Sequence, residues 1–306
     1  MDRRITSWLA AVAVFILIGV LTPFMFYPMA ITIITRRPYT LHIGYVETSL
    51  GPFILVLPAG ADTIVAISLV VTGISAAIYL AVRDRYIHVV KLRAELMRFI
   101  STIHAMVRSQ VSVLDALREA ANMVGEPLAS YIKRFVSLVR LGEDPHRAID
   151  KVFKNVPSEV KLLASSLAIA MVSGGHVSEV LRESDVYVQQ LQRMDYIRLH
   201  RLSEQKFVAL MAVLTFAASG ATVIWLIGYL APRLATLPGA RMINVQFVAS
   251  SYFLASLVML IIASFVVSRI VSGTFVLAPK YIALIAPLLG AIFAFASSGL
   301  MSLLIP

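Results

Sequence analysis

Few residues of this sequence could do chemistry on their own. There is no cysteine, which excludes disulfides, thiolate metal sites, iron–sulfur clusters and cysteine nucleophiles. No two histidines lie three or four residues apart on one predicted helix, the spacing that a metal site would need. The sequence also lacks the P-loop, HExxH, calcium-loop and GxSxG patterns. We therefore predict a protein that is not an enzyme and that binds no metal and no cofactor.

The composition indicates whether the chain is surrounded by water or by lipid. Hydrophobic residues make up 59% of the chain and charged residues only 14%, whereas soluble domains carry about 25% charged residues. A core of ordinary size cannot hide this excess, so the composition predicts a multi-pass membrane protein. In such a protein a net charge of +10 reflects Lys and Arg retained on the cytoplasmic side. We therefore expect the lipid bilayer as a partner, and no nucleic acid.

Five apolar segments are long enough to cross a bilayer as helices. None contains Asp, Glu, Lys, Arg or His, although proton relays and ion-coupled transport need ionisable groups at membrane depth. This absence argues against an ion-coupled transporter. The predicted spans are residues 8–26, 63–82, 207–230, 245–268 and 282–304.

Two of these spans carry small residues at four-residue spacing. Such rows let helix backbones approach closely, and they serve both packing within a chain and dimer faces. We favour packing within the chain, and a dimer face stays open. The rows are Gly73, Ala77 and Ala81 in the second span, and Ala286, Gly290, Ala294 and Ser298 in the fifth.

The charges divide the chain into three regions. Residues 1–82 hold two spans and an outer loop over 27–62, and residues 207–306 hold three spans. Between them, residues 83–206 contain 19 of the 27 basic and 14 of the 17 acidic residues. Apolar residues recur there at helical spacing, with Gly, Pro and capping residues between the runs. We predict an all-α fold whose cytoplasmic region is an up-and-down six-helix bundle.

The turns of this bundle are predicted to alternate between its two ends, because successive helices run in opposite directions. The turns at 109–112, 142–145 and 173–176 then lie at the end away from the membrane, and those at 125–127 and 155–157 face it. The sixth helix has no Gly or Pro between Gly175 and Gly220, so it should continue into the third span. From His176 to Tyr229 it would extend about 80 Å as a rigid lever.

The order of these pieces resembles the type II secretion F domain, which is found in the platform proteins of type IV pilus, archaellum and type II secretion machines. The resemblance covers roughly residues 90–230. Gln110 stands in the first turn, where many members have glycine. The matching stretches are "LRAELMRFISTIHAMVRSQVSVLDALREAA", "LVRLGEDPHRAIDKVFKNVPSE" and "AIAMVSGGHVSEVLRES".

The resemblance implies a function without catalysis. A platform protein of the cytoplasmic membrane contacts a hexameric secretion ATPase and passes its movement to pilin subunits. This chain has one F domain, similar to Tad-like or archaeal pilus versions, so we expect a dimer with itself or with a paralogue. Together with the alternation of turns, the resemblance predicts an ATPase-facing surface of Gln110, Gly142, Glu143, Asp144, Gly174, Gly175, His176 and Glu179.

Rival functions come from other classes of protein. Glu119-Ala120-Ala121 followed by Gly125 is similar to the start of the coupling loop in ABC permeases, which would suggest a permease or channel subunit. We find no polar pore-lining face, and we interpret this stretch as a helix that ends in a glycine cap. A membrane receptor would need an outer domain large enough to bind a ligand, and the loop after the first span is short.

The distribution of basic residues predicts the topology. With the N-terminus in the cytoplasm, the inner segments carry 23 basic residues and the outer loops only four. The C-terminus then lies outside. A reporter fused after Pro306 should be active only on the outer side of the cytoplasmic membrane. Activity in the cytoplasm would show that one span has been miscounted.

Overall fold

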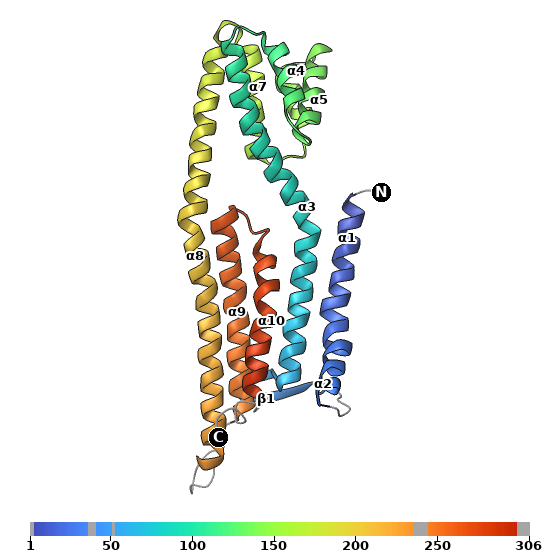
Figure 1. Ribbon diagram of the computed structural model, residues 1–306, viewed down its shortest axis with the longest axis vertical. Helices are drawn as coiled ribbons and strands as arrows, with labels where there is room; N and C mark the ends of the chain where they lie inside the picture. Colours follow the sequence, from blue (N-terminus) through green and yellow to red (C-terminus); the bar gives the residue numbers. More distant parts are fainter. Residues whose placement is uncertain (1–2, 36–40, 51–52, 235–243, 299–306) are drawn as a thin grey trace. The chain divides into compact units, whose positions relative to one another are not determined.

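The computed structural model describes residues 3–35, 41–50, 53–234 and 244–298 (Figure 1). The chain forms two compact units. The first, here the membrane unit, comprises Met1–Arg83 and His200–Pro306, and the second, the bundle unit, comprises Asp84–Leu199.

The described residues form ten α-helices, one π-helical and one 3-10 segment, and one two-stranded hairpin. The all-α prediction is confirmed, with the hairpin as an addition. The elements are α1 (Arg3–Val14), the π-helical η1 (Phe15–Phe26), α2 (Tyr27–Thr35), β1 (Gly44–Leu50), β2 (Phe53–Ala59), α3 (Ala61–Arg108), α4 (Val113–Met123), α5 (Leu128–Arg140), α6 (Pro145–Val152), α7 (Ser158–Val172), the 3-10 turn η2 (Gly174–His176), α8 (Val177–Leu234), α9 (Val245–Ser272) and α10 (Ala278–Ser297).

Five helical segments of the described chain are long and apolar enough to cross a membrane, as predicted. The first runs over Trp8–Ile33 rather than ending at Phe26. The helix continues past Pro23 because the π-helical segment η1 accommodates this residue, which lacks a backbone N–H. The other four lie within α3, Glu204–Ala231, α9 and α10.

The segment predicted as an outer loop over 27–62 is instead structured. It contains α2 and an antiparallel hairpin whose register runs from Gly44 opposite Ala59 to Leu50 opposite Phe53. Asp62, buried in the first turn of α3, accepts hydrogen bonds from Tyr27 Oη (3.0 Å) and from the backbone N of His42 (3.3 Å). The hairpin and α2 are therefore tied to the start of the second span.

Small residues allow close helix contacts inside the membrane unit. A Cβ added to Gly73 of α3 would lie 2.6 Å from the Cα of Gly19 in η1. A Cβ on Gly290 of α10 would overlap the side chain of Ser68 on α3. Of the other small residues in the two rows, Ala286 is buried, Ala77, Ala81 and Ala294 are half-buried, and Ser298 is exposed. Gly73 and Gly290 thus meet other helices of the same chain.

The bundle unit is built on apolar faces at the predicted positions. Leu92, Leu96, Phe99, Ile100 and Ile103 of α3 are fully buried in its core, and Met106 and Val107 pack against it. The predicted caps are also present: Ser112 Oγ accepts the backbone N–H of Asp115 at the start of α4. The predicted glycine cap of α4 is wrong, because Val124 leaves the helix in an extended conformation and packs on the core before Gly125.

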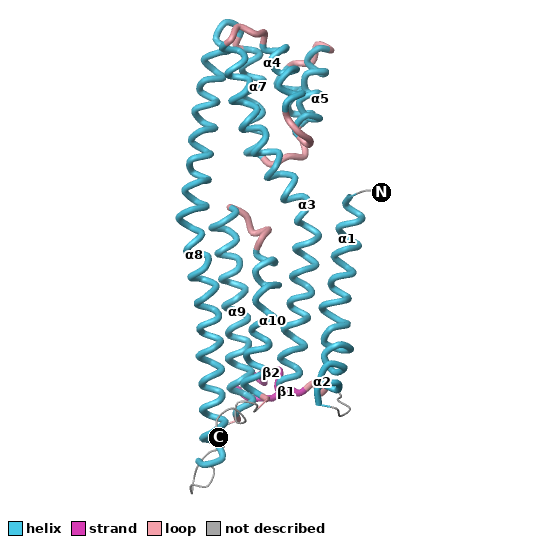
Figure 2. The backbone as a smooth tube through the Cα atoms, viewed as in Figure 1, coloured by secondary structure: helices cyan, strands magenta, loops and turns pink. Residues whose placement is uncertain are grey.

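Two helices belong to both units without interruption. The second span and the first bundle helix form one helix, α3. No Gly or Pro occurs between Gly73 and Gly125, so nothing in the sequence stops it. The continuous sixth helix is observed as α8, over Val177–Leu234 (Figure 2).

The contact between Gly73 and Gly19 leads to a matched pair of substitutions. Gly73→Ala should destabilise the protein by about 1–3 kcal/mol, because the new methyl group meets backbone rather than a movable side chain. Gly228→Ala on α8 is the control, since a Cβ there would have no atom within 4 Å. Thermal unfolding in detergent, followed by circular dichroism, measures both variants. Equal stability of the two variants would contradict the packing described here.

Candidate functional site

The register between α3 and α8 defines the two ends of the bundle unit. Arg93 forms an ion pair with Asp195 (3.2 Å), while Ser101 donates to Asp185 (2.5 Å) and His104 Nδ1 lies 3.3 Å from the same carboxylate. Higher residue numbers on α3 therefore pair with lower residue numbers on α8, which shows that the two helices are antiparallel. The last turn of α3 lies level with the first turns of α8. The turns at 109–112 and 173–176 thus share one end of the bundle.

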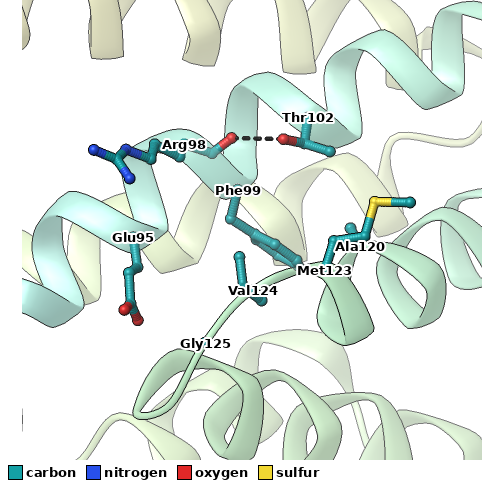
Figure 3. Close-up of a pocket in the computed structure, with 8 residues that line it drawn as sticks. All are labelled: Glu95, Arg98, Phe99, Thr102, Ala120, Met123, Val124 and Gly125. Carbon is teal, nitrogen blue, oxygen red and sulfur yellow. Dashed lines mark hydrogen bonds between the residues drawn. The ribbon is translucent and has the colours of Figure 1, made fainter.

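The turn between α4 and α5 lies at the other end. The backbone N of Leu128 donates to Glu95 Oε2 (3.4 Å), about 20 Å along α3 from its end at Arg108. A cavity of about 310 Å³ lies beside this turn (Figure 3). Phe99 of α3 points toward Val124 and Met123 across it. The residues that line it are Glu95, Arg98, Phe99, Thr102, Ala120, Met123, Val124 and Gly125.

The packing of α5 and α6 shows at which end of the bundle the remaining turns lie. α5 starts beside Glu95 and ends at Arg140, so Gly142 lies at the same end as Gln110. The rings of Tyr131 and Phe153 lie 5.2 Å apart, which places the end of α6 beside the start of α5. The turns at 109–112, 142–145 and 173–176 therefore share one end, as the alternation predicts. We call residues 109–112, 141–145 and 173–179 the three-turn end.

Each turn of the three-turn end contains one residue with left-handed backbone. The φ angles are +65° at Gln110, +88° at Gly142 and +57° at Gly174. Glycine adopts this region without cost, whereas a residue with a Cβ is strained by roughly 1–2 kcal/mol. The first turn is therefore as sharp as the other two, although Gln110 occupies the position where glycine is expected.

The charged residues of the three-turn end are held in local interactions. Glu143 forms an ion pair with Lys151 (2.8 Å), and Asp144 accepts the backbone N–H groups of His146 (3.0 Å) and Arg147 (3.1 Å). Glu179 lies 3.6 Å from His176, and its side chain is 67% exposed. Leu141 beside them is 83% exposed, a large apolar side chain in water. This end thus carries the exposed apolar Leu141 in the same turn as Glu143 and Asp144, and Glu179 just after the turn made by Gly174 and Gly175.

The arrangement fits binding to another protein. Among the described residues, no group of three or more His, Asp or Glu side chains lies close enough to hold a metal ion. Leu141 and Glu179 are exposed, and Glu143 is half-buried beside Lys151. Which partner binds there stays a prediction.

Sequence reasoning missed the polar contacts inside the α3–α8 seam. Asp185, Ser101 and His104 are part-buried between the two helices. The available signal was that Ser101 and His104, three residues apart, interrupt a helix face that is otherwise apolar. Glu95, which accepts a hydrogen bond from the start of α5, was also missed, because its partner lies 33 residues away along the chain.

The five apolar helices and the separate helical bundle define a multi-pass membrane protein with an α-helical second unit. Residues 99–224 match the family model described as "Type II secretion system (T2SS), protein F". The chain therefore carries a single T2SS protein F domain, as its sequence predicted. No curated protein and no solved structure matches the chain.

Two opposite substitutions test the backbone of the three-turn end. Gln110→Gly should leave the bundle as stable or raise its stability by up to about 1 kcal/mol, because relief of strain exceeds the added unfolded-state entropy. Gly142→Ala should lower stability by about 1–2 kcal/mol, since space is free around its Cβ and only the backbone is strained. Hydrogen exchange of bundle amides in the full chain measures the stability of the bundle in both variants. A loss of stability in Gln110→Gly would contradict the left-handed conformation.

Proposed function

We propose that this protein is the cytoplasmic-membrane platform of a type IV pilus-like filament or type II secretion machine. In this role it couples a cytoplasmic hexameric secretion ATPase to the assembly of pilin subunits. The observation that carries the proposal is the single F domain inserted between apolar membrane helices. The function is assembly and mechanical coupling, without catalysis by this chain.

The ATPase is proposed to bind the three-turn end. Its turns belong to different helix pairs but meet at one end of the bundle unit. The second turn offers the partner the apolar Leu141 and the acidic Glu143, and the start of α8 after the third turn offers the acidic Glu179. The bundle region as a whole is basic, so this end is distinguished from the remainder of its surface. Basic groups on the ATPase would favour its encounter with this acidic surface and its orientation on it.

Movement of the bundle is proposed to reach the pilin through α3 and α8. Each helix contributes residues to both units with no interruption of its backbone hydrogen bonds. A displaced bundle would therefore act directly on the spans that these helices form. The partner pilins would be contacted from the membrane unit. A second copy of this chain or a paralogue would supply the second F domain, and cross-linking in native membranes tests for this dimer.

Charge reversal at the three-turn end tests the proposed ATPase contact. Glu143→Lys combined with Glu179→Lys should insert into the membrane at normal levels. Glu179 is 67% exposed, and Glu143, which is 26% exposed, loses a surface ion pair with Lys151 of the kind that contributes at most about 1 kcal/mol. The same variant should abolish recruitment of the secretion ATPase and filament formation. Asp144 is left unchanged, since it caps α6.

The matched control is Glu119→Lys combined with Glu126→Lys. Both side chains are exposed on α4 and on the turn at the other end of the bundle, and the change in net charge is the same. This control should recruit the ATPase normally. Equal recruitment of the ATPase by both double variants would show that the ATPase does not bind at the three-turn end. Co-purification with the ATPase from solubilised membranes provides the measurement.

A further inference from the structure

The turn between α9 and α10 in the membrane unit, drawn as a loop in Figure 2, is flanked by three cationic side chains. Arg269 lies in the last turn of α9 and Lys280 in the first turn of α10, and both are exposed. Lys206 of α8 joins them, because its Nζ lies 5.4 Å from the ring centroid of Tyr281. We call Lys206, Arg269 and Lys280 the basic rim.

No carboxylate neutralises the basic rim within the part of the chain that the structure describes. None of its three side chains forms an ion pair there. Among the described acidic residues of the membrane unit, Glu47 and Asp62 lie on the hairpin and at the start of α3. That is the opposite end of α9, because Ser250 near the start of α9 donates to the carbonyl of Pro58 in β2. Glu204, two residues before Lys206, is exposed.

The turn that carries the basic rim is held in one conformation by its own hydrogen bonds. Ser268 Oγ donates to the carbonyl of Thr274 (2.7 Å) and accepts the backbone N–H of Leu277 (3.1 Å). Arg269 donates to the carbonyl of Gly273, whose φ of +69° closes the turn. Arg269 and Lys280 are therefore positioned before any ligand binds.

Exposed aromatic and aliphatic side chains lie beside the cations of this turn. The Arg269 guanidinium lies 5.3 Å from the ring centroid of Phe275, and Phe275 packs on Phe265 at 5.9 Å. Both rings are largely exposed, as are Ile262 and Val266 below them on α9. An exposed apolar surface that ends in cations is typical of a helix at the bilayer interface.

We propose that the basic rim binds the headgroup of an anionic phospholipid. The lipid phosphate would lie among Lys206, Arg269 and Lys280, and the acyl chains would follow the exposed apolar side chains of α9. Cations contributed by several membrane helices are a recognised arrangement for anionic lipid headgroups. The site is separate from the three-turn end, so it does not depend on the proposed ATPase contact.

The test uses the full chain purified in mild detergent and titrated with phosphatidylglycerol or phosphatidylcholine. Wild type should bind phosphatidylglycerol in preference to phosphatidylcholine, as measured by native mass spectrometry. The triple variant Lys206→Gln, Arg269→Gln and Lys280→Gln should bind phosphatidylglycerol about a hundredfold more weakly, since each basic residue near an anionic surface contributes roughly one factor of five. Unchanged affinity in the triple variant would overturn the proposal.

Three controls make the result specific. Arg233→Gln removes a cation from the last turn of α8, 27 residues beyond Lys206, and should leave phosphatidylglycerol binding unchanged. Arg269→Lys with Lys280→Arg keeps the charge and should retain binding, which separates charge from folding should the triple variant insert poorly. Inorganic phosphate at the same concentration should not displace the lipid. Displacement by phosphate, or equal binding of phosphatidylcholine, would contradict a phospholipid site.

Discussion

The structure depends on the unbroken backbone hydrogen bonding of two helices, α3 and α8. Inside a bilayer every backbone N–H and C=O group must be satisfied within the protein, so the spans of these helices have to be helical. The same helices supply residues to the bundle unit, where the requirement comes instead from apolar packing. Leu92, Leu96 and Phe99 of α3 are fully buried there. Continuity between the two environments follows from the absence of Gly and Pro along both helices where the units join.

Polar contacts in the α3–α8 seam set the register of the bundle unit. Arg93 with Asp195, and His104 with Asp185, fix two levels along the antiparallel pair. The other helices are placed relative to this pair by apolar packing and by Glu95, which meets the start of α5. The short turns then fall alternately at the two ends. Three left-handed residues at one end allow these turns to be tight and to lie close together.

Much of this organisation could be predicted because its causes are local in sequence. Uncharged runs identify the spans, and Ser112 and Asp144 identify helix starts, since a capping side chain acts within three residues. The alternation of turns follows from short connections alone. The ends of the bundle could therefore be assigned to the correct residues without coordinates.

What could not be predicted depends on partners far apart in the sequence or on weak local signals. The first span extends to Ile33 because a π-helical segment carries the chain past Pro23. The hairpin at 44–59 has only Gly51-Pro52 between its strands as a turn signal, and it is supported by contacts with Thr63 and with α9. The seam residue Asp185 meets partners more than 80 positions away. These features arise from tertiary packing, which composition and periodicity do not report.

The central claim is that α8 is one continuous helix from the bundle unit into the membrane unit, so that movement of the one reaches the other. The chain has no cysteine, so two introduced cysteines carry the only spin labels. Glu183→Cys and Gln205→Cys place labels at exposed positions of α8, about 33 Å apart along a continuous helix. Pulsed electron paramagnetic resonance in nanodiscs should give a single narrow distance distribution near that value. A broad distribution, or a clearly shorter distance, would show that α8 is interrupted and would contradict direct mechanical coupling.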